Sequence, residues 1–252
     1  MPFGLFGRPR RPELPEGSRV YAIGDVHGRL DLLRALLSRI RKDDAGRPPA
    51  DTRIILLGDL IDRGPDSAGV VAMAMQPLDF ATVTALQGNH EAMMLAALDG
   101  NPEALAGWLR FGGRQALASW GVAQRLLEDD DADRILDAAR ALIPEAQRQW
   151  LAERPKGVHL GDYYFVHAGV RPRLPLHRQS DEDQLWIREP FLSSRARHFA
   201  MIVHGHSVTP DVEWMPNRIG IDTGAYATGR LTALALDGAH QWILQATAPG
   251  PA

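Results

Sequence analysis

Histidines and carboxylates follow glycines at the ends of five apolar stretches of this chain. The five motifs are GDVHG, GDLIDRG, GNHE, HAG and HGHS, which carry Asp25, His27, Asp59, Asp62, Arg63, Asn89, His90, His167, His204 and His206. Carboxylate, imidazole and amide oxygen bind hard to borderline divalent metals, and the chain has no cysteine that could offer a thiolate. The motifs therefore predict a site for manganese, iron, zinc or magnesium.

The stretch LLGDLIDRG, residues 56–64, places two carboxylates and an arginine at the exit of an apolar run. Buried carboxylates are costly unless a cation or hydrogen bonds compensate them. Asp25 and His27 are separated by one residue, so both side chains point the same way from an extended strand end. Two metals could then share Asp59 as a bridge. Each residue alone could be a turn or cap residue, but the series of five motifs favours a metal centre.

Hydrophobic periodicity predicts the elements that must position these motifs. Residues 19–24 form a short apolar run, and apolar residues then repeat with helical spacing over 33–40. A second strand at 53–59 precedes a helix that starts and stops within 65–77, and a third strand lies in 81–89. Three strand–helix units in a row indicate parallel strands, and ligands bind at the carboxyl ends of such strands.

The second half of the chain has a different pattern. Residues from about 92 to 157 are rich in Ala, Leu, Arg and Glu and are interrupted by Gly and Pro, which indicates an insertion of several short helices. Strand patterns return at residue 158, and Gly161-Asp162 between two β-rich runs predicts a hairpin. The series of strands that follows is too short-looped for crossover helices, so mostly antiparallel pairing is expected here.

Composition limits the class of protein. The chain has 252 residues, a formal net charge of −3 and scattered basic residues, so a nucleic-acid partner is not expected. No apolar stretch approaches the roughly 20 residues of a membrane helix, so no membrane partner is expected. The absence of cysteine fits a reducing cytoplasm. One catalytic domain at 19–246 is predicted, between a flexible arm at 1–18 and a flexible tail at 247–252.

The ordered series GDVHG, GDLIDRG, GNHE, HAG and GHS resembles the metallophosphoesterase superfamily, and closely its phosphoprotein phosphatase branch, which includes compact bacterial and phage serine/threonine phosphatases. The match spans about residues 20–236. The resemblance implies an α/β fold: a mixed β-sandwich flanked by helices, with a helical insertion between the third and fourth motifs. It also implies a dinuclear centre, in which the first metal is held by Asp25 and His27, both by Asp59, and the second by Asn89, His167 and His206.

Two details of HGHS bear on this resemblance. The histidine after the glycine matches the family's ligand, so His206 is expected to bind metal, whereas His204 supports it or fills space on the strand. Val208 stands where many members of the superfamily carry a second ligating histidine. That difference is typical of the phosphoprotein phosphatase branch and argues against a nuclease.

The resemblance also assigns the groups that act on substrate. Arg63 and Arg188, the latter in LWIRE, match the family's phosphate-gripping arginines, although Arg188 could be a surface residue. His90 matches the acid that protonates the leaving oxygen, and Asp62 would orient its ring and raise its pKa. Tyr226 lies where the branch has a tyrosine near the metals, and a packing role fits it equally well.

The implied reaction is hydrolysis by direct attack of a hydroxide activated by two metal ions, with no phosphoenzyme. The expected activity is that of a serine/threonine protein phosphatase, with phosphotyrosine as a further substrate and manganese preferred over iron and zinc. The alternative is a symmetrical dinucleoside tetraphosphate hydrolase that cleaves Ap4A to two ADP, with adenine contacts from Trp108, Phe111, Trp120 and Trp150. An inactive binding module should show a broken ligand set, which this sequence does not. The partner is thus a phosphorylated protein or peptide, or a small nucleotide, and the oligomeric state stays open.

Overall fold

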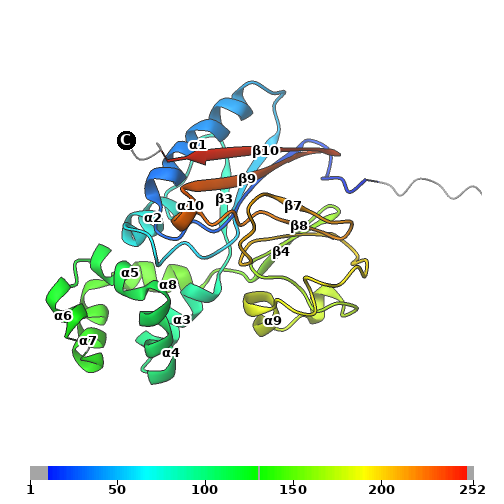
Figure 1. Cartoon of the computed structure of the whole chain (residues 1–252). Helices are drawn as coiled ribbons and strands as arrows, with labels where there is room; N and C mark the ends of the chain where they lie inside the picture. The colour runs from blue at the N-terminus through cyan, green and yellow to red at the C-terminus, as the bar shows by residue number, and fades with distance from the viewer. Residues whose placement is uncertain (1–10, 130, 249–252) are drawn as a thin grey trace, which may run out of the picture.

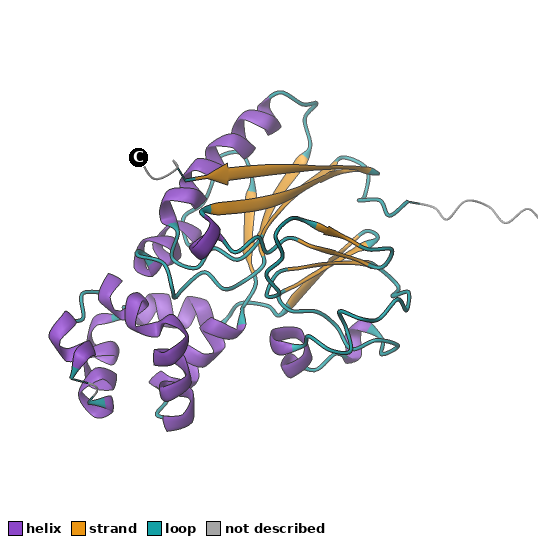
Figure 2. Ribbon diagram, viewed as in Figure 1, coloured by secondary structure: helices purple, strands orange, loops and turns teal. Residues whose placement is uncertain are grey.

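The computed structural model describes residues 11–129 and 131–248, which form two packed five-stranded β-sheets with helices around them (Figures 1 and 2). The first sheet has the order β10-β9-β1-β2-β3, with β1 (Ser18–Ile23), β2 (Asp51–Leu56), β3 (Thr82–Ala85), β9 (Arg230–Asp237) and β10 (His240–Thr247). The second has the order β4-β5-β6-β8-β7, with β4 (Gly157–Leu160), β5 (Tyr163–Val166), β6 (Met201–His204), β7 (Glu213–Trp214) and β8 (Arg218–Gly220). This mixed α/β architecture confirms the fold class expected from the sequence.

The parallel units predicted for the first third of the chain are present. β1 pairs in parallel with β2, and β2 pairs in parallel with β3. The connecting helices α1 (Leu30–Ala45) and α2 (Ser67–Ala74) bury their apolar residues against this sheet. The side chain of Asp66 caps α2 by accepting a hydrogen bond from the backbone N–H of Gly69. The three strands therefore bring the ends of the first three motifs to one edge of the sheet.

β1 is buried on both faces, which explains its apolar run. Tyr21 and Ile23 lie in the core on the helix side of the sheet, whereas Val20 and Ala22 lie in the core between the two sheets. Successive side chains of a strand point to opposite faces, so a strand covered on both sides needs apolar residues at every position. The second sheet contributes Phe165 to the same inter-sheet core.

The expectation of mostly antiparallel pairing in the second half is wrong for its central strands. The predicted hairpin is present as the antiparallel pair β4–β5, but β5 pairs in parallel with β6, and β6 in parallel with β8. The β5–β6 connection spans residues 167–200 and contains the 3₁₀ helix η2 (Leu176–Arg178) and α9 (Asp181–Trp186), so it is long enough for a crossover. β7 takes the edge by pairing with β8, which leaves β8 beside β6.

The helical insertion lies beside the sheets at the end where the first three motifs emerge (Figure 1). It begins with α3, whose first residues belong to the third motif, and ends before β4. Its members are α3 (Asn89–Leu98), α4 (Pro102–Trp108), the π-helical turn η1 (Leu109–Gly113), α5 (Arg114–Ser119), α6 (Gln124–Glu128), α7 (Ala132–Leu142) and α8 (Glu145–Ala152). A last short helix, α10 (Ala225–Thr228), precedes β9.

The chain ends only partly follow the predicted arm and tail. Residues 11–17, assigned to the arm, contact both sheets: Leu14 is buried, and its N–H donates to the carbonyl of Gly238, while the N–H of Glu13 donates to Asp162. The rest of the arm, 1–10, and residues 249–252 of the tail lie outside the described residues. None of the described helices is both long enough and apolar enough to cross a bilayer.

Candidate active site

The strand exits adopt a strained backbone where the motif residues lie. Within the described ranges, six residues other than glycine have positive φ, and five of them belong to the motifs: His27 (45°), Asp59 (47°), Asp62 (74°), Arg63 (65°) and His206 (62°). A side chain on Cβ disfavours this left-handed region, so such residues persist only where the surrounding structure holds them. Their concentration at one place marks these turns as a functional site.

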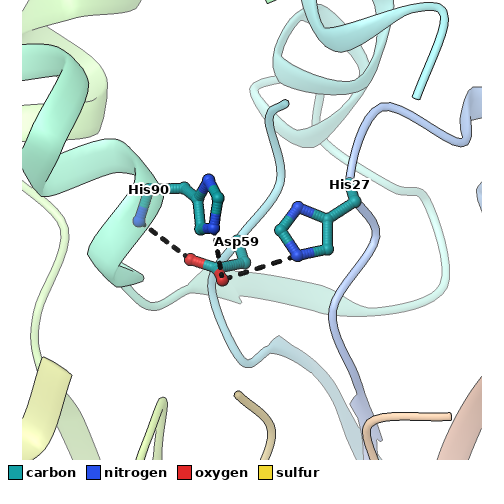
Figure 3. A group of neighbouring side chains, drawn as sticks. All are labelled: His27, Asp59 and His90. Atoms are coloured by element: carbon teal, nitrogen blue, oxygen red, sulfur yellow. Dashed lines mark hydrogen bonds and ion pairs between the residues drawn. The ribbon is translucent and has the colours of Figure 1, made fainter. Parts of the chain in front are cut away.

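Asp59 lies at the centre of the site, between two groups of imidazoles. Its Oδ2 is 3.6 Å from Nε2 of His27 and 3.8 Å from Nε2 of His90, and both rings point toward the carboxylate (Figure 3). Its Oδ1 is 3.4 Å from Nε2 of His167, which groups with His206. One carboxylate therefore presents a separate oxygen to each histidine group, as a bridging metal ligand does.

Asn89 joins the second group from the start of α3. Its Oδ1 lies 2.8 Å from Nε2 of His167 and 2.9 Å from Nδ1 of His206. All three residues are buried. The amide oxygen, two ring nitrogens and Oδ1 of Asp59 thus form a compact donor set that could hold a second cation.

Backbone carbonyls fix the tautomers of two of these histidines. The carbonyl of Ile61 lies 2.8 Å from Nδ1 of His27, and that of Leu57 lies 2.9 Å from Nδ1 of His167. A carbonyl can only accept, so each Nδ1 carries the proton and each Nε2 keeps its lone pair directed toward Asp59. This is the arrangement that metal-ligating histidines require, so the residues fit divalent ions.

The pKa shifts agree with a ligand role. Burial, reinforced by the neighbouring charges of His90 and Arg63, lowers the pKa of His27 to about 3, so this ring is neutral. Burial also lowers the pKa of His206 to about 3. Burial opposes ionisation of Asp59, but the surrounding imidazoles outweigh it and lower the pKa of Asp59. A carboxylate beside the neutral rings of His27 and His206 is ready to bind a cation.

Asp25 lies beside these groups but belongs to neither of them. Its carboxylate accepts from the backbone N–H of His206 at 3.0 and 3.2 Å, and it shares a hydrogen bond with the carboxyl group of Asp222. Burial, together with the charges of Asp222 and Asp59, raises the pKa of Asp25 well above its usual value. Three acidic groups in one buried pocket repel one another, and a bound cation would relieve that repulsion.

A hydrogen-bonded chain holds His90. Its Nδ1 lies 2.6 Å from Oδ2 of Asp62, and the indole N–H of Trp108 donates to Oδ1 of Asp62 at 2.8 Å. Burial lowers the pKa of His90, but the charges of Asp59 and Asp62 and the bond to Asp62 outweigh it and raise that pKa. Burial also raises the pKa of Asp62. The pair therefore retains a proton to higher pH than either group would alone.

Two arginines and a tyrosine lie next to these groups. The guanidinium of Arg63 donates to Nε2 of His27 and to Nε2 of His90, both at 2.9 Å, and lies 4.6 Å from the ring centre of Tyr226. Tyr226 also packs edge-on against His27, with ring centres 5.3 Å apart. Nε of Arg188 donates to Nε2 of His206 at 3.3 Å. The structure thus brings both predicted arginines and Tyr226 to the histidine groups, and Arg188 is not an isolated surface residue.

A model of the calcineurin-like phosphoesterase family matches residues 18–235. The chain belongs to this family. A symmetrical bis(5'-nucleosyl)-tetraphosphatase of Acidovorax sp. (strain JS42) is 30% identical over 85% of this chain and 65% of its own length. A stretch covering 34% of this chain is 37% identical to serine/threonine-protein phosphatase 1 of Salmonella typhimurium, over 36% of that protein. The chain thus spans less than two thirds of either relative.

Solved structures support the same calcineurin-like fold. A putative diadenosine tetraphosphatase superposes with a TM-score of 0.66 and 20% identity, over 95% of this chain and 100% of the other. A cold-active protein-tyrosine phosphatase of a psychrophilic Shewanella sp. superposes with a TM-score of 0.56 and 19% identity, over 93% of this chain and 83% of the other. At these identities the likeness concerns the fold alone.

The calcineurin-like site opens into a cleft of about 550 Å³. Asp59, Asn89, His90 and His206 contribute its polar floor. Its rim includes exposed apolar side chains, namely Phe111 (50% exposed), Trp186 (37%), Val208 (50%) and Tyr226 (38%). An apolar rim around a polar floor fits a ligand that has both phosphates and an apolar or aromatic part.

The prediction of adenine contacts is wrong for three of the four aromatic residues. Trp108 and Trp120 are buried, with their indole N–H groups bonded to Asp62 and Gln147. Trp150 packs against the insertion core and does not line the cleft. The three tryptophans lie in or at the end of three different helices of the insertion, and nothing in the local sequence distinguishes them from Phe111, which reaches the rim.

Sequence reasoning missed the role of Glu91, which it interprets as a helix-start residue favoured by the helix dipole. The backbone N–H groups of Asp59 and Gly88 donate to its Oε2 at 2.9 and 2.8 Å, and those of Leu60 and Ile61 donate to its Oε1 at 2.8 and 3.2 Å. Burial raises the pKa of Glu91 to about 7, although these donors favour the ionised form. Glu91 therefore fastens the strained turn that carries Asp59 to the start of α3.

Asp222 was also missed, although its motif offers a signal. It follows β8 in the stretch IDTG, a carboxylate at a strand exit close to a glycine, as in the other motifs. Its Oδ1 accepts from the N–H of Gly224 at 2.9 Å, and burial raises the pKa of Asp222 to about 6. His204, by contrast, packs edge-on against Phe191 at 5.1 Å and fills space behind the site.

Proposed function

We propose that this protein is a metal-dependent hydrolase of phosphate bonds whose preferred substrate is a dinucleoside tetraphosphate, cleaved symmetrically to two nucleoside diphosphates. The observation that carries the hydrolase assignment is the shared carboxylate of Asp59 between two groups of histidines, at the floor of the cleft. This proposal reverses the preference drawn from the sequence, which favours a phosphoprotein substrate and gives the dinucleoside tetraphosphate as the alternative. Relatives matching up to 85% of the chain are named symmetrical tetraphosphatases, and the rim offers aromatic side chains for bases.

The residues that would hold two divalent ions are the set carried by the motifs. Asp25 and His27 would bind the first ion, Asp59 both, and the second would be held by Asn89, His167 and His206. Manganese suits these oxygen and imidazole donors, and iron and zinc are the alternatives. Such ions, when bound, supply a water of lowered pKa and polarise the phosphoryl group.

Arg63 and Arg188 would bind the phosphate oxygens from two sides of the floor. Both guanidinium groups lie at the cleft surface, and their forked N–H groups match phosphate geometry. In the structure each donates to a histidine of the site, His27 or His206. Each arginine therefore starts within reach of the reacting phosphoryl group and can stabilise its growing charge.

His90 would be the general acid. Asp62 holds its Nδ1, which directs Nε2 into the cleft. In the reaction, the oxygen of water bonds to one of the two inner phosphorus atoms of the tetraphosphate. The bond from that phosphorus to the central bridging oxygen breaks, and His90 donates a proton to the departing oxygen. One water is consumed and two molecules of ADP form from Ap4A.

A phosphoprotein is the second candidate substrate, because of the 37% identity to serine/threonine-protein phosphatase 1. The test is kcat/KM of the manganese-loaded protein on Ap4A and on a phosphothreonine peptide, with Asp59→Asn purified in parallel to reveal contaminating phosphatases. We expect Ap4A to be preferred by tenfold or more, with ADP as the product. A higher kcat/KM on the peptide would overturn the substrate assignment, and activity on neither would overturn the hydrolase assignment.

A further inference from the structure

Two exposed aromatic side chains line the cleft from two different walls. Phe111 lies in the turn η1 of the helical insertion, and Trp186 is the last residue of α9, in the β5–β6 crossover. In Figure 1 the insertion and α9 are separate groups of helices below the sheets. The cleft therefore has one aromatic residue on a wall formed by the insertion and one on a wall formed by the β5–β6 crossover.

Each of these aromatic residues lies close to a segment that carries one of the two arginines of the cleft. Trp186 is two residues from Arg188. Phe111 precedes Gly112, whose carbonyl accepts from the backbone N–H of Arg63 at 3.3 Å. Each wall thus combines a flat apolar ring with a guanidinium, the two groups that a nucleoside diphosphate needs for its base and its phosphates.

A symmetrical substrate makes such an arrangement informative. Half of a dinucleoside tetraphosphate is a nucleoside diphosphate, so central cleavage requires the two halves to extend equally from the floor. A base site on one wall alone would fix one nucleotide of the substrate and leave the position of the other nucleotide undefined. Tyr226 is less suited to stacking, because its ring packs edge-on against His27 and lies 4.6 Å from the guanidinium of Arg63. The ring of Phe111, by contrast, has one such contact among the described residues, with Arg110 at 5.7 Å.

We infer that Phe111 and Trp186 form a two-walled base clamp that binds one nucleobase each and so sets cleavage at the central anhydride. The inference rests on the proposed function for its substrate. It adds to that function the residues that contact the bases. It also predicts that these residues determine which products form. Without one ring of the clamp, the phosphate chain can shift by one phosphate, so that AMP and ATP form beside ADP.

The test uses the full chain with Phe111→Ala and Trp186→Ala, the conservative variants Phe111→Tyr and Trp186→Phe, and Phe199→Ala as a control. Phe199 is 89% exposed and lines a different groove. Stacking on an aromatic ring is lost on substitution by alanine, and we expect each such variant to lose about tenfold in kcat/KM on Ap4A, beyond any loss on p-nitrophenyl phosphate. We also expect a measurable fraction of AMP and ATP. The conservative variants should restore both properties, and Phe199→Ala should match wild type.

Calorimetric binding of ADP and of pyrophosphate separates this clamp from the proposed function. We expect wild type to bind ADP more tightly than pyrophosphate, and each alanine variant to lose about tenfold of that preference. Equal binding of the two ligands by wild type, or alanine variants with wild-type ADP binding and products, would overturn the clamp. A wild-type protein that prefers the phosphothreonine peptide yet binds ADP through these rings would overturn the proposed substrate and retain the clamp.

Discussion

The floor and the rim of the cleft are built differently. Floor residues such as Asp59 and His90 are buried, lie on strained or helix-start backbone, and are hydrogen-bonded to other segments of the chain. Rim residues such as Phe111 and Trp186 are exposed and project from short helical segments. A change on the floor must disturb several segments at once, whereas a rim side chain can change alone. We therefore expect that substitutions on the floor disturb the fold as well as the site, whereas substitutions on the rim change which ligands are bound.

The turn η1 joins the two regions. Its flanking residue Trp108 supports Asp62, and its Gly112 supports Arg63, while Phe111 between them faces the cleft. Gly112 has φ of 120°, and a Cβ there would lie 2.6 Å from the backbone nitrogen of Arg63. π-helical turns of this kind are frequent at functional sites. The insertion thus supports the floor and supplies part of the rim.

The largest expected effect is that of Asp59→Asn. An amide cannot bridge two cations as a carboxylate does, so we expect kcat/KM to fall by at least about a thousandfold on every substrate, with loss of metal. Activity assays and metal analysis of the purified variant check this. Near-normal turnover with both metals retained would show that Asp59 is not the bridge.

Removal of metal should abolish activity and also lower stability. Ions that bind only the folded floor stabilise it by mass action, by about 4 kcal/mol at a thousandfold excess over Kd, so chelation should lower Tm by roughly 10 °C. Thermal unfolding with and without EDTA measures the shift, and added manganese should reverse it. An unchanged Tm would contradict a floor held together by bound cations.

His90→Asn tests the general acid. Poor leaving groups need a proton and good ones do not, so we expect a loss of about 10²–10⁴ on Ap4A or an alkyl phosphate and a much smaller loss on p-nitrophenyl phosphate. Equal losses on both classes would count against the acid. Circular dichroism and metal content should match wild type for the comparison to hold.

A smaller effect is expected from Trp108→Phe, for which the chain offers a matched control in Trp120→Phe. Both indoles are buried in the insertion and each donates one hydrogen bond, but only that of Trp108 reaches the floor, through Asp62. Both variants should lose about 1–3 kcal/mol of unfolding free energy, because an acceptor loses its donor. Only Trp108→Phe should lose activity on poor leaving groups, by about tenfold. Similar kinetics in the two variants would confine Trp108 to a structural role.

The side-chain types at the candidate site, the order of the motifs and the parallel units that bring the first three together could all be predicted from the sequence. The signals are short apolar runs, helical repeats, glycines at strand exits, and the absence of cysteine. The sequence also predicted the hairpin at Gly161 and the helical insertion, each from residues adjacent in the chain.

How distant segments meet could not be predicted in this way. The parallel pairing of β5 with β6 depends on a long crossover, the support of Asp62 by Trp108 joins residues 46 positions apart, and Glu91 binds backbone groups that leave no trace in side-chain pattern. The same holds for the rim, since Trp108 and Phe111 are equally aromatic, and only the turn between them buries one and exposes the other. Local sequence fixes what each segment prefers, but burial and partners depend on the path of the whole chain.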